Sequence, residues 1–309
     1  MMRTRLARTL VAFVALLVIG PVLAPDAGAA TLRVGTFGDG LGAELFAPTS
    51  MPPGSNNWAC HPSSAHPRPV ILVHGTLANE AFSWQALSPM LANAGYCVFA
   101  FNYGQNGATL GHFFGLTDIA ASAGELATFV DQVRAATGAA QVDLVGHSQG
   151  GMMPRYYLKN LGGAPKVHEL VGLAPSNHGT TVLGLNALLN GLKLAGVPVT
   201  SAIGCISCTQ QIVPSSFISA LNSGGDTVPG VKYVVIESKY DEVVTPYRSA
   251  FLTGANVKNI LIQDQCPIDF DGHIGIVFDH IALRDMLNAL DPAHAQGAWC
   301  TPIAFDLGG

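Results

Sequence analysis

Short runs of apolar, β-branched residues recur along most of the chain and alternate with segments of helical periodicity. The run at residues 69–73 ends at His74-Gly75, which is typical of a buried parallel strand followed by a turn. Similar runs predict further strands at residues 96–101, 142–145, 170–174, 231–236 and 259–262.

Helices are predicted between these strands. From Ile119 to Val133, apolar residues recur at mixed helical spacings, and Gly138 supplies a stop signal. Other helical patterns lie at residues 82–94, 152–161 and 283–290. The alternation indicates an α/β fold with a doubly wound, mostly parallel sheet and right-handed crossovers.

The stretch at residues 175–229 interrupts this alternation. Within it, Asn186, Asn190 and Lys193 fall on one face of a predicted helix and four leucines on the other. Two interpretations stay open: a helix packed on the core, or a lid or cap whose apolar face covers or lines an acyl-binding groove. On the second, the residues that contact substrate are Leu185, Leu188, Leu189 and Leu192.

The first thirty residues are typical of a secretory signal peptide. Arg3, Arg5 and Arg8 precede an apolar run at residues 10–19, and small residues follow up to Ala30. The alternative is a membrane anchor, but this run falls short of the roughly 20 residues needed to span a bilayer. We therefore expect a signal peptide at 1–30, one domain at 31–309, and a secreted protein with no stable membrane anchor after cleavage.

Composition and charge narrow the choice of partners. The net charge is -5, and without the predicted leader it is -7, from 12 basic and 19 acidic residues, because Arg3, Arg5, Arg8 and Asp26 are removed. No basic patch favours nucleic acid. Only 11% of residues are charged and 49% are hydrophobic, which predicts a large core and some exposed apolar surface.

Six cysteines lie in the predicted mature part, and export would place them in an oxidising compartment. We expect disulfides, with about 15 possible full pairings. The Cys205-Ile-Ser-Cys208 spacing also occurs in zinc knuckles and redox pairs, but a second pair of metal ligands is missing. The cysteines are Cys60, Cys97, Cys205, Cys208, Cys266 and Cys300.

The run Gly146-His147-Ser148-Gln149-Gly150 carries the clearest chemical signal. It lies between a predicted strand and a predicted helix, the setting of a nucleophile elbow, where flanking glycines avoid collisions in a strained turn. We therefore predict Ser148 as the nucleophile, and His147 as a structural residue that points away from it. Pro154 predicts a kink or a late start of the following helix.

A serine hydroxyl needs an imidazole to accept its proton and a carboxylate to orient that imidazole. Asp241 follows the strand at 231–236 and so lies at the sheet edge where ligands bind, which makes it the predicted acid. His273, in the loop after the last strand, is the predicted base. The weaker candidates are Asp226, Glu237 and Glu242 for the acid, and His280 and His294 for the base.

The oxyanion that forms on Ser148 attack needs two N–H donors. Gln149 directly follows the nucleophile, and Thr76 lies in the loop after the first strand. We predict their backbone N–H groups as the oxyanion hole, with the Thr76 hydroxyl as a further donor.

Residues 69–290 resemble secreted bacterial triacylglycerol lipases of the α/β-hydrolase superfamily, of the class 2-like type found in actinobacterial relatives of the small bacillus lipases. The resemblance rests on the runs at residues 73–76, 146–151, 239–246 and 272–275. It implies the same triad, Ser148, Asp241 and His273, and the same oxyanion donors, Thr76 and Gln149.

The insert at 175–229 and the cysteines depart from the smallest lipases of this kind. A likeness to certain fungal lipases implies the pairs Cys60–Cys97 and Cys266 with Cys205 or Cys208. Some larger bacterial lipases hold a structural calcium near the catalytic histidine, and Asp269 and Asp271 invite that comparison. Neighbouring aspartates are commonly just solvated, so we predict no metal.

The predicted reaction is hydrolysis of carboxylic esters through an acyl-enzyme, without a cofactor. The expected substrate is a lipid or another ester, in the lipid case at a lipid–water interface. A short-chain esterase, a polyester depolymerase and an acyltransferase share the mechanism and stay open. A non-catalytic binding protein of the same fold is the remaining alternative, although such proteins lose triad members.

Overall fold

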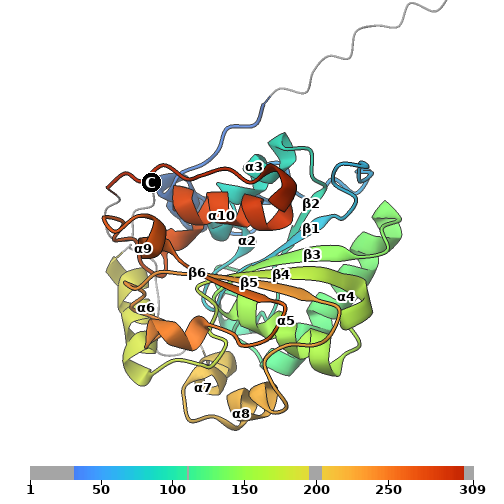
Figure 1. Ribbon diagram of the computed structural model, residues 1–309. Helices are drawn as coiled ribbons and strands as arrows, with labels where there is room; N and C mark the ends of the chain where they lie inside the picture. Colours follow the sequence, from blue (N-terminus) through green and yellow to red (C-terminus); the bar gives the residue numbers. More distant parts are fainter. Residues whose placement is uncertain (1–30, 110, 195–203, 303–309) are drawn as a thin grey trace, which may run out of the picture. The chain divides into compact units, whose positions relative to one another are not determined.

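The computed structural model describes residues 31–109, 111–194 and 204–302 (Figure 1). Its contacts divide the chain into two units, residues 1–31 and 32–309, and the architecture below is that of the second. The predicted signal peptide at 1–30 lies outside the described residues. None of the described helices is long and apolar enough to cross a membrane.

A parallel sheet of six strands organises the described residues, in the order β2-β1-β3-β4-β5-β6. All six predicted strands and their parallel pairing are confirmed. The order reverses at β1, between β2 and β3, and in open α/β sheets the crevice at the carboxyl ends of the strands near such a point binds ligands. The strands are β1 Val70–Val73, β2 Val98–Phe101, β3 Val142–His147, β4 Val167–Leu173, β5 Lys232–Glu237 and β6 Val257–Leu261.

Helices cover both faces of the sheet (Figure 1). On one face, α4 (Ile119–Thr137) and α5 (Gln149–Asn160) bury their apolar residues against the strands. On the other face lie α2 (Glu80–Ser83), α3 (Leu87–Asn93) and α10 (His280–Leu290). Two further helices are α1 (Phe37–Phe46) and α9 (Ile262–Gln265).

One expectation for the helices was wrong, and one of two alternatives for another is excluded. Residues 82–94 form parts of two helices, because the fully buried Trp84 leaves the helical conformation and the Gln85 carbonyl accepts a hydrogen bond from Gly35 N. Of the two alternatives expected from Pro154, a kink or a late start of the helix, the late start is absent: α5 begins directly after Ser148 and contains Pro154. Helix α4 does end where predicted, with Gly138 in the left-handed conformation.

The insert at residues 175–229 contains α6 (Val182–Leu194), α7 (Ile206–Gln211) and α8 (Ser216–Asn222), and its residues 195–203 are not described. The predicted amphipathic helix is α6, with Asn186, Asn190 and Lys193 exposed. The two ends of the insert meet at the fully buried Arg155 of α5.

Arg155 joins these ends by hydrogen bonds. Its guanidinium donates to the carbonyl oxygens of Asn177 and Asp226, both at 3.0 Å, and to Asn222 Oδ1 at 2.6 Å. Burial lowers the pKa of Arg155 to about 10, so it keeps its charge at neutral pH. The base of the insert is therefore fixed to the helix that follows Ser148.

Three disulfides use all six cysteines, which all lie in the described part: Cys60–Cys97, Cys205–Cys208 and Cys266–Cys300. The expected Cys60–Cys97 pair is confirmed. The expected pairing of Cys266 with Cys205 or Cys208 was wrong, because those two residues adjoin each other at the start of α7. Cys266 lies after α9, in the core beneath α10, where the C-terminal segment brings Cys300 to a Cα–Cα distance of 5.0 Å.

Candidate active site

Ser148 occupies a strained turn between β3 and α5. Its φ of 55° and ψ of -124° lie in a region that non-glycine residues rarely adopt. The positions of Gly146 and Gly150, on either side of Ser148, leave no room for a side chain. A Cβ on Gly146 would lie 1.9 Å from the Gly150 carbonyl oxygen, and a Cβ on Gly150 would lie 2.1 Å from that of Val73. The turn thus presents Ser148 at the N-terminus of α5, where the helix dipole favours negative charge.

Asp241 and His273 come together from the loops after β5 and β6. His273 Nδ1 lies 2.7 Å from Asp241 Oδ2, and both side chains are buried. Asp241 Oδ1 accepts from the backbone N–H groups of Val243 and Val244, at 2.8 and 2.7 Å, which fixes the carboxylate. With Nδ1–H donating to Asp241, the lone pair of the imidazole lies on Nε2, as a general base requires.

His147, next to the nucleophile, contacts the backbone of the predicted base. Its Nε2 lies 2.9 Å from the His273 carbonyl oxygen, and the two rings are 4.8 Å apart. Burial, and then the neighbouring His273, lower the pKa of His147 well below 6.5, so it is neutral at physiological pH. A neutral His147 can donate a hydrogen bond to the loop that carries His273 without adding a charge beside it.

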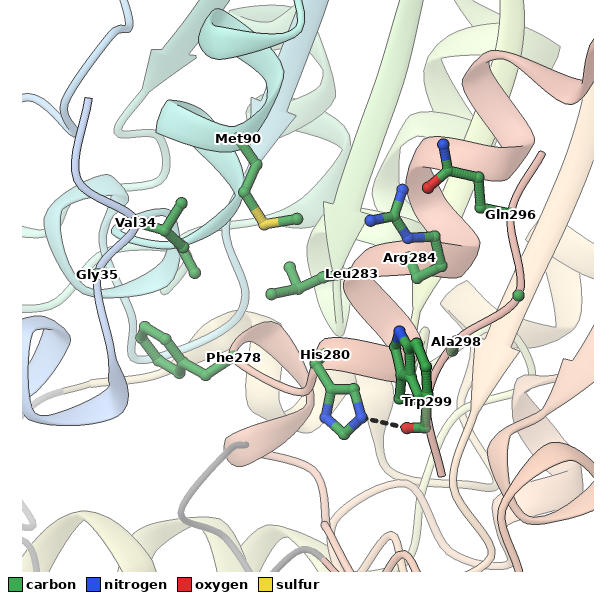
Figure 2. A pocket seen from close by; sticks show the side chains of 12 residues that line it. Val34, Gly35, Met90, Phe278, His280, Leu283, Arg284, Gln296, Ala298 and Trp299 are labelled. Carbon is green, nitrogen blue, oxygen red and sulfur yellow. Dashed lines mark hydrogen bonds between the residues drawn. The ribbon is translucent and has the colours of Figure 1, made fainter. Parts of the chain in front are cut away.

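Two of the weaker candidates, Asp226 for the acid and His280 for the base, lie in different surroundings. Asp226 contacts Arg155 at 3.6 Å and His178 at 3.1 Å. His280, the first residue of α10, bonds through Nε2 to the Trp299 carbonyl oxygen at 2.5 Å. It lines a cavity of about 360 Å³, whose walls include neither Ser148 nor Asp241 (Figure 2). This cavity is called the second cavity below, to distinguish it from the cavity at Ser148.

Glu237 ends β5 in a fully buried position near Asp241. Its Oε1 accepts from Ser238 N at 2.8 Å. Burial, and then the charge of Asp241, raise its pKa well above 4.5. Both effects favour the protonated form of the Glu237 carboxyl group.

Thr76 and Gln149 meet beside Ser148. The Thr76 hydroxyl donates to Gln149 Oε1 at 2.6 Å, so its hydrogen is directed at the protein in this structure. The preceding residue, Gly75, passes so close that a Cβ there would lie 3.0 Å from Ser148 Cβ. Gln149 is the first residue of α5, and the first N–H groups of a helix have no acceptor within it.

A narrow cavity of about 20 Å³ reaches Ser148, a volume that holds about one water molecule. Two of the predicted leucines, Leu185 and Leu188, line it, and Leu189 packs in the adjoining apolar cluster. The side chain of Leu192 lies outside the described part. The remaining lining residues are Thr76, Ser176, Thr180, Cys208, Gln211, Val243 and Val244, of which only Thr76 and Cys208 were singled out from the sequence.

Buried carboxyl groups also lie near the His273 loop. The expectation that Asp269 and Asp271 are solvated was wrong: both are fully buried, and Asp271 N donates to Asp269 Oδ1 at 2.9 Å. Burial raises the pKa of Asp279 to about 8, and Asp269 adds to the shift. Elsewhere in the described residues, Asp143, His168 and Glu169 have metal-ligand spacing, but Arg68 and His168 already pair with Asp143. The absence of a metal stays a prediction.

Comparisons with known proteins identify the family of the chain. The family model for lipase (class 2) matches residues 67–281. A triacylglycerol lipase from Burkholderia plantarii is 34% identical over 161 residues, which cover 50% of this chain and 36% of that protein. A triacylglycerol lipase from Pseudarthrobacter phenanthrenivorans is 38% identical over 94 residues, which cover 28% of this chain and 27% of that protein. The chain thus spans about a third of the length of the curated relatives it matches.

Solved structures support the α/β-hydrolase fold. Aspergillus fumigatus lipase B has a TM-score of 0.59 at 23% identity, over 82% of this chain and 62% of that chain. Bacillus licheniformis lipase BlEst2 in its propeptide form has a TM-score of 0.51 at 15% identity, over 79% of this chain and 53% of that one. At such identities the likeness concerns the fold, whereas the family model covers most of the sequence: the chain belongs to the class 2 lipase family.

Proposed function

We propose that the protein hydrolyses carboxylic esters, with Ser148 as nucleophile, His273 as base and Asp241 as acid, and that its substrates are triacylglycerols. The observation that carries the proposal is the buried His273–Asp241 pair at 2.7 Å, formed at the sheet edge where the strained Ser148 turn lies. Membership of the class 2 lipase family and the triacylglycerol lipase relatives support the substrate class.

In the proposed mechanism, Ser148 Oγ attacks the ester carbonyl carbon while His273 Nε2 takes its proton. The carbonyl oxygen becomes an oxyanion, which the N–H groups of Gln149 and Thr76 stabilise. His273 then gives the proton to the leaving alcohol as the C–O bond breaks. Water, deprotonated by His273, attacks the acyl-enzyme and releases the carboxylic acid and Ser148.

Apolar surroundings favour a lipid as the acyl donor. Leu185, Leu188 and Val243 line the cavity at Ser148, so an acyl chain that enters meets hydrocarbon. Helix α6, which supplies the two leucines, also exposes apolar residues and suits a lipid–water interface. We propose that this helix belongs to a lid formed by the insert.

Secretion is part of the same proposal. All six cysteines are paired, which suits an oxidising compartment outside the cytosol. The basic, then apolar, then small-residue pattern of residues 1–30 supplies the expected export signal.

The test is hydrolysis of p-nitrophenyl esters from acetyl to palmitoyl, and of emulsified triolein, by the wild-type protein and by Ser148→Ala and Asp241→Asn. Activity should extend to triolein and disappear in Ser148→Ala. Asp241→Asn should lower kcat by about 10⁴-fold, because the amide no longer holds the imidazole in the reactive tautomer. Activity confined to short esters would identify an esterase instead, and no ester hydrolysis by the wild type would refute the proposal.

A further inference from the structure

One side chain of the insert reaches the residues around Ser148. Gln211 is the last residue of α7 and is buried. Its Nε2 lies 2.8 Å from Thr76 Oγ1 and 3.0 Å from Gln149 Oε1, and its Oε1 accepts from Ser176 Oγ at 2.7 Å. Gln211 thereby connects the loops after β1, β3 and β4 at the edge of the sheet that carries the nucleophile.

These contacts set the directions of the neighbouring polar groups. A hydroxyl carries a single hydrogen, so Thr76 Oγ1, which accepts from Gln211, directs its own hydrogen at Gln149 Oε1. Gln149 Oε1 receives two donors, which fixes the orientation of its amide. Gln211 has two N–H hydrogens for three acceptors, the third being the Ser207 carbonyl oxygen at 3.2 Å.

Gln211 is itself held in place. Its carbonyl oxygen accepts from Thr180 N at 2.8 Å, and the Cys205–Cys208 disulfide closes the start of its short helix. At the same end, Ile206 N donates to the Leu116 carbonyl oxygen at 2.8 Å. The amide group is therefore positioned before substrate arrives, as groups that support transition-state stabilisation must be.

We infer that Gln211 is a positioning residue of the active site, which holds Thr76 and Gln149 so that their backbone N–H groups converge on the oxyanion. The inference rests on the proposed ester hydrolysis. It gives the insert a part in the chemical step as well as in access to the site. Because Gln211 acts through its neighbours, its loss should lower kcat more than it raises KM.

The chain offers a matched control in the adjacent residue. Gln210 is on the same helix and also makes two polar contacts, with Asp118 Oδ2 at 2.7 Å and Ile119 N at 2.9 Å, neither of which involves a residue of the proposed site. A general loosening of α7 should affect Gln210→Met and Gln211→Met alike. A positioning role requires that they differ.

The experiment measures kcat and KM for p-nitrophenyl butyrate, and inhibition by an alkylboronic acid that forms a tetrahedral adduct with serine. Gln211→Met should lower kcat by roughly tenfold, less than the 10²–10³ of removing an oxyanion donor itself, with KM within about twofold. Boronate affinity should fall in parallel with kcat, because the adduct uses the same donors. Gln210→Met should match the wild type.

Gln211→Glu provides a second variant of nearly the same size. It keeps an acceptor for Ser176 but, when ionised, cannot donate to Gln149, so its kcat should fall at least as far. Wild-type kcat in both Gln211 variants, or an equal loss in Gln210→Met, would overturn the inference while leaving ester hydrolysis intact. Absence of hydrolysis in the wild type would instead contradict the proposed function, and this inference with it.

Discussion

Helices α5 and α6 are of similar length and both adjoin the candidate site, but they are packed differently. Most of α5 is buried against the sheet and α4, including Met152 and Met153. In contrast, α6 buries Leu188 but exposes Val182, Leu183 and Leu194 by 57%, 79% and 90% of their surfaces. The apolar side chains of α5 thus lie mostly in the core, whereas several apolar side chains of α6 lie at the surface.

This difference in packing corresponds to two proposed tasks, proton transfer and contact with an apolar substrate. The residues proposed for proton transfer are held by the sheet and by helices packed on it, where a small displacement has a large cost. The apolar groups that border the 20 Å³ cavity come partly from the insert, which contributes Leu185, Leu188 and Cys208. The described residues around this cavity leave about 20 Å³, which is less than an acyl chain occupies.

Adding one methyl group to each helix is the strongest test of this comparison. Gly150→Ala would place a Cβ 2.1 Å from the Val73 carbonyl oxygen, in α5. Gly191→Ala in α6 would meet only Ile274 Cδ1, at 3.0 Å, and that side chain can shift. We expect Gly150→Ala to lose about 100-fold or more in kcat/KM, as misplacement by an ångström can cause, and Gly191→Ala to stay near wild type.

The measurement is kcat/KM on p-nitrophenyl butyrate together with the melting temperature. Equal effects of the two substitutions would contradict the assigned difference in packing.

The exposed face of α6 supplies the next test. Replacing Val182 and Leu183 together by serine removes apolar surface that would contact a lipid phase. Since full burial of one such side chain is worth about 1.5–3 kcal/mol, and about 1.4 kcal/mol is a factor of ten, hydrolysis of emulsified triolein should fall at least about tenfold. Hydrolysis of soluble p-nitrophenyl butyrate should change little.

Trp299→Ser is the control, because Trp299 is also strongly exposed but lines the second cavity, apart from α6 (Figure 2). Should both proteins lose triolein activity equally, the effect would reflect general surface hydrophobicity rather than the insert.

The smallest expected effect is on the pH dependence of stability. Asp226 is the only acidic residue in the sequence of the insert, so we expect this dependence to come mainly from residues outside the insert. Burial raises the pKa of Glu80, in α2, from 4.5 to about 7. Between these values the folded protein keeps a proton that the unfolded chain has lost, so stability falls as pH rises.

Glu80→Gln removes this dependence. The difference in melting temperature between Glu80→Gln and the wild type should therefore increase from pH 4.5 to pH 7. A change of about 1–3 kcal/mol in the free energy of unfolding corresponds to several degrees. At pH 4.5 and below, the difference should not change with pH. A difference that is flat across the whole range would show that Glu80 ionises normally in the folded protein.

Much of the fold could be predicted because buried parallel strands are continuous apolar runs. The positions of Asp241 and His273 follow from the same rule, since loops at the carboxyl ends of strands meet at one edge. Local periodicity could not predict the break near Trp84, which depends on a hydrogen bond from the distant Gly35 to Gln85.

The cysteine pairs and the contacts of Gln211 could be predicted even less well from the sequence. Cys266 pairs with Cys300 because the C-terminal segment returns along α10, from Asn288 to His280, which no spacing in the sequence indicates. Gln211 meets Thr76 and Gln149 across 135 and 62 positions of sequence. A glutamine in a short polar helix carries no pattern that marks its partners, so this part of the site is visible only in three dimensions.

The clamp formed by Arg155 has a consequence for how such a domain can diversify. Because one buried guanidinium holds Asn177, Asn222 and Asp226, the two ends of the insert stay together whatever lies between them. The segment between these anchors can therefore change in length without separating the strands to which its ends are attached. Such a change has to keep Gln211, which lies inside the segment, for the proposed positioning of Thr76 and Gln149 to persist.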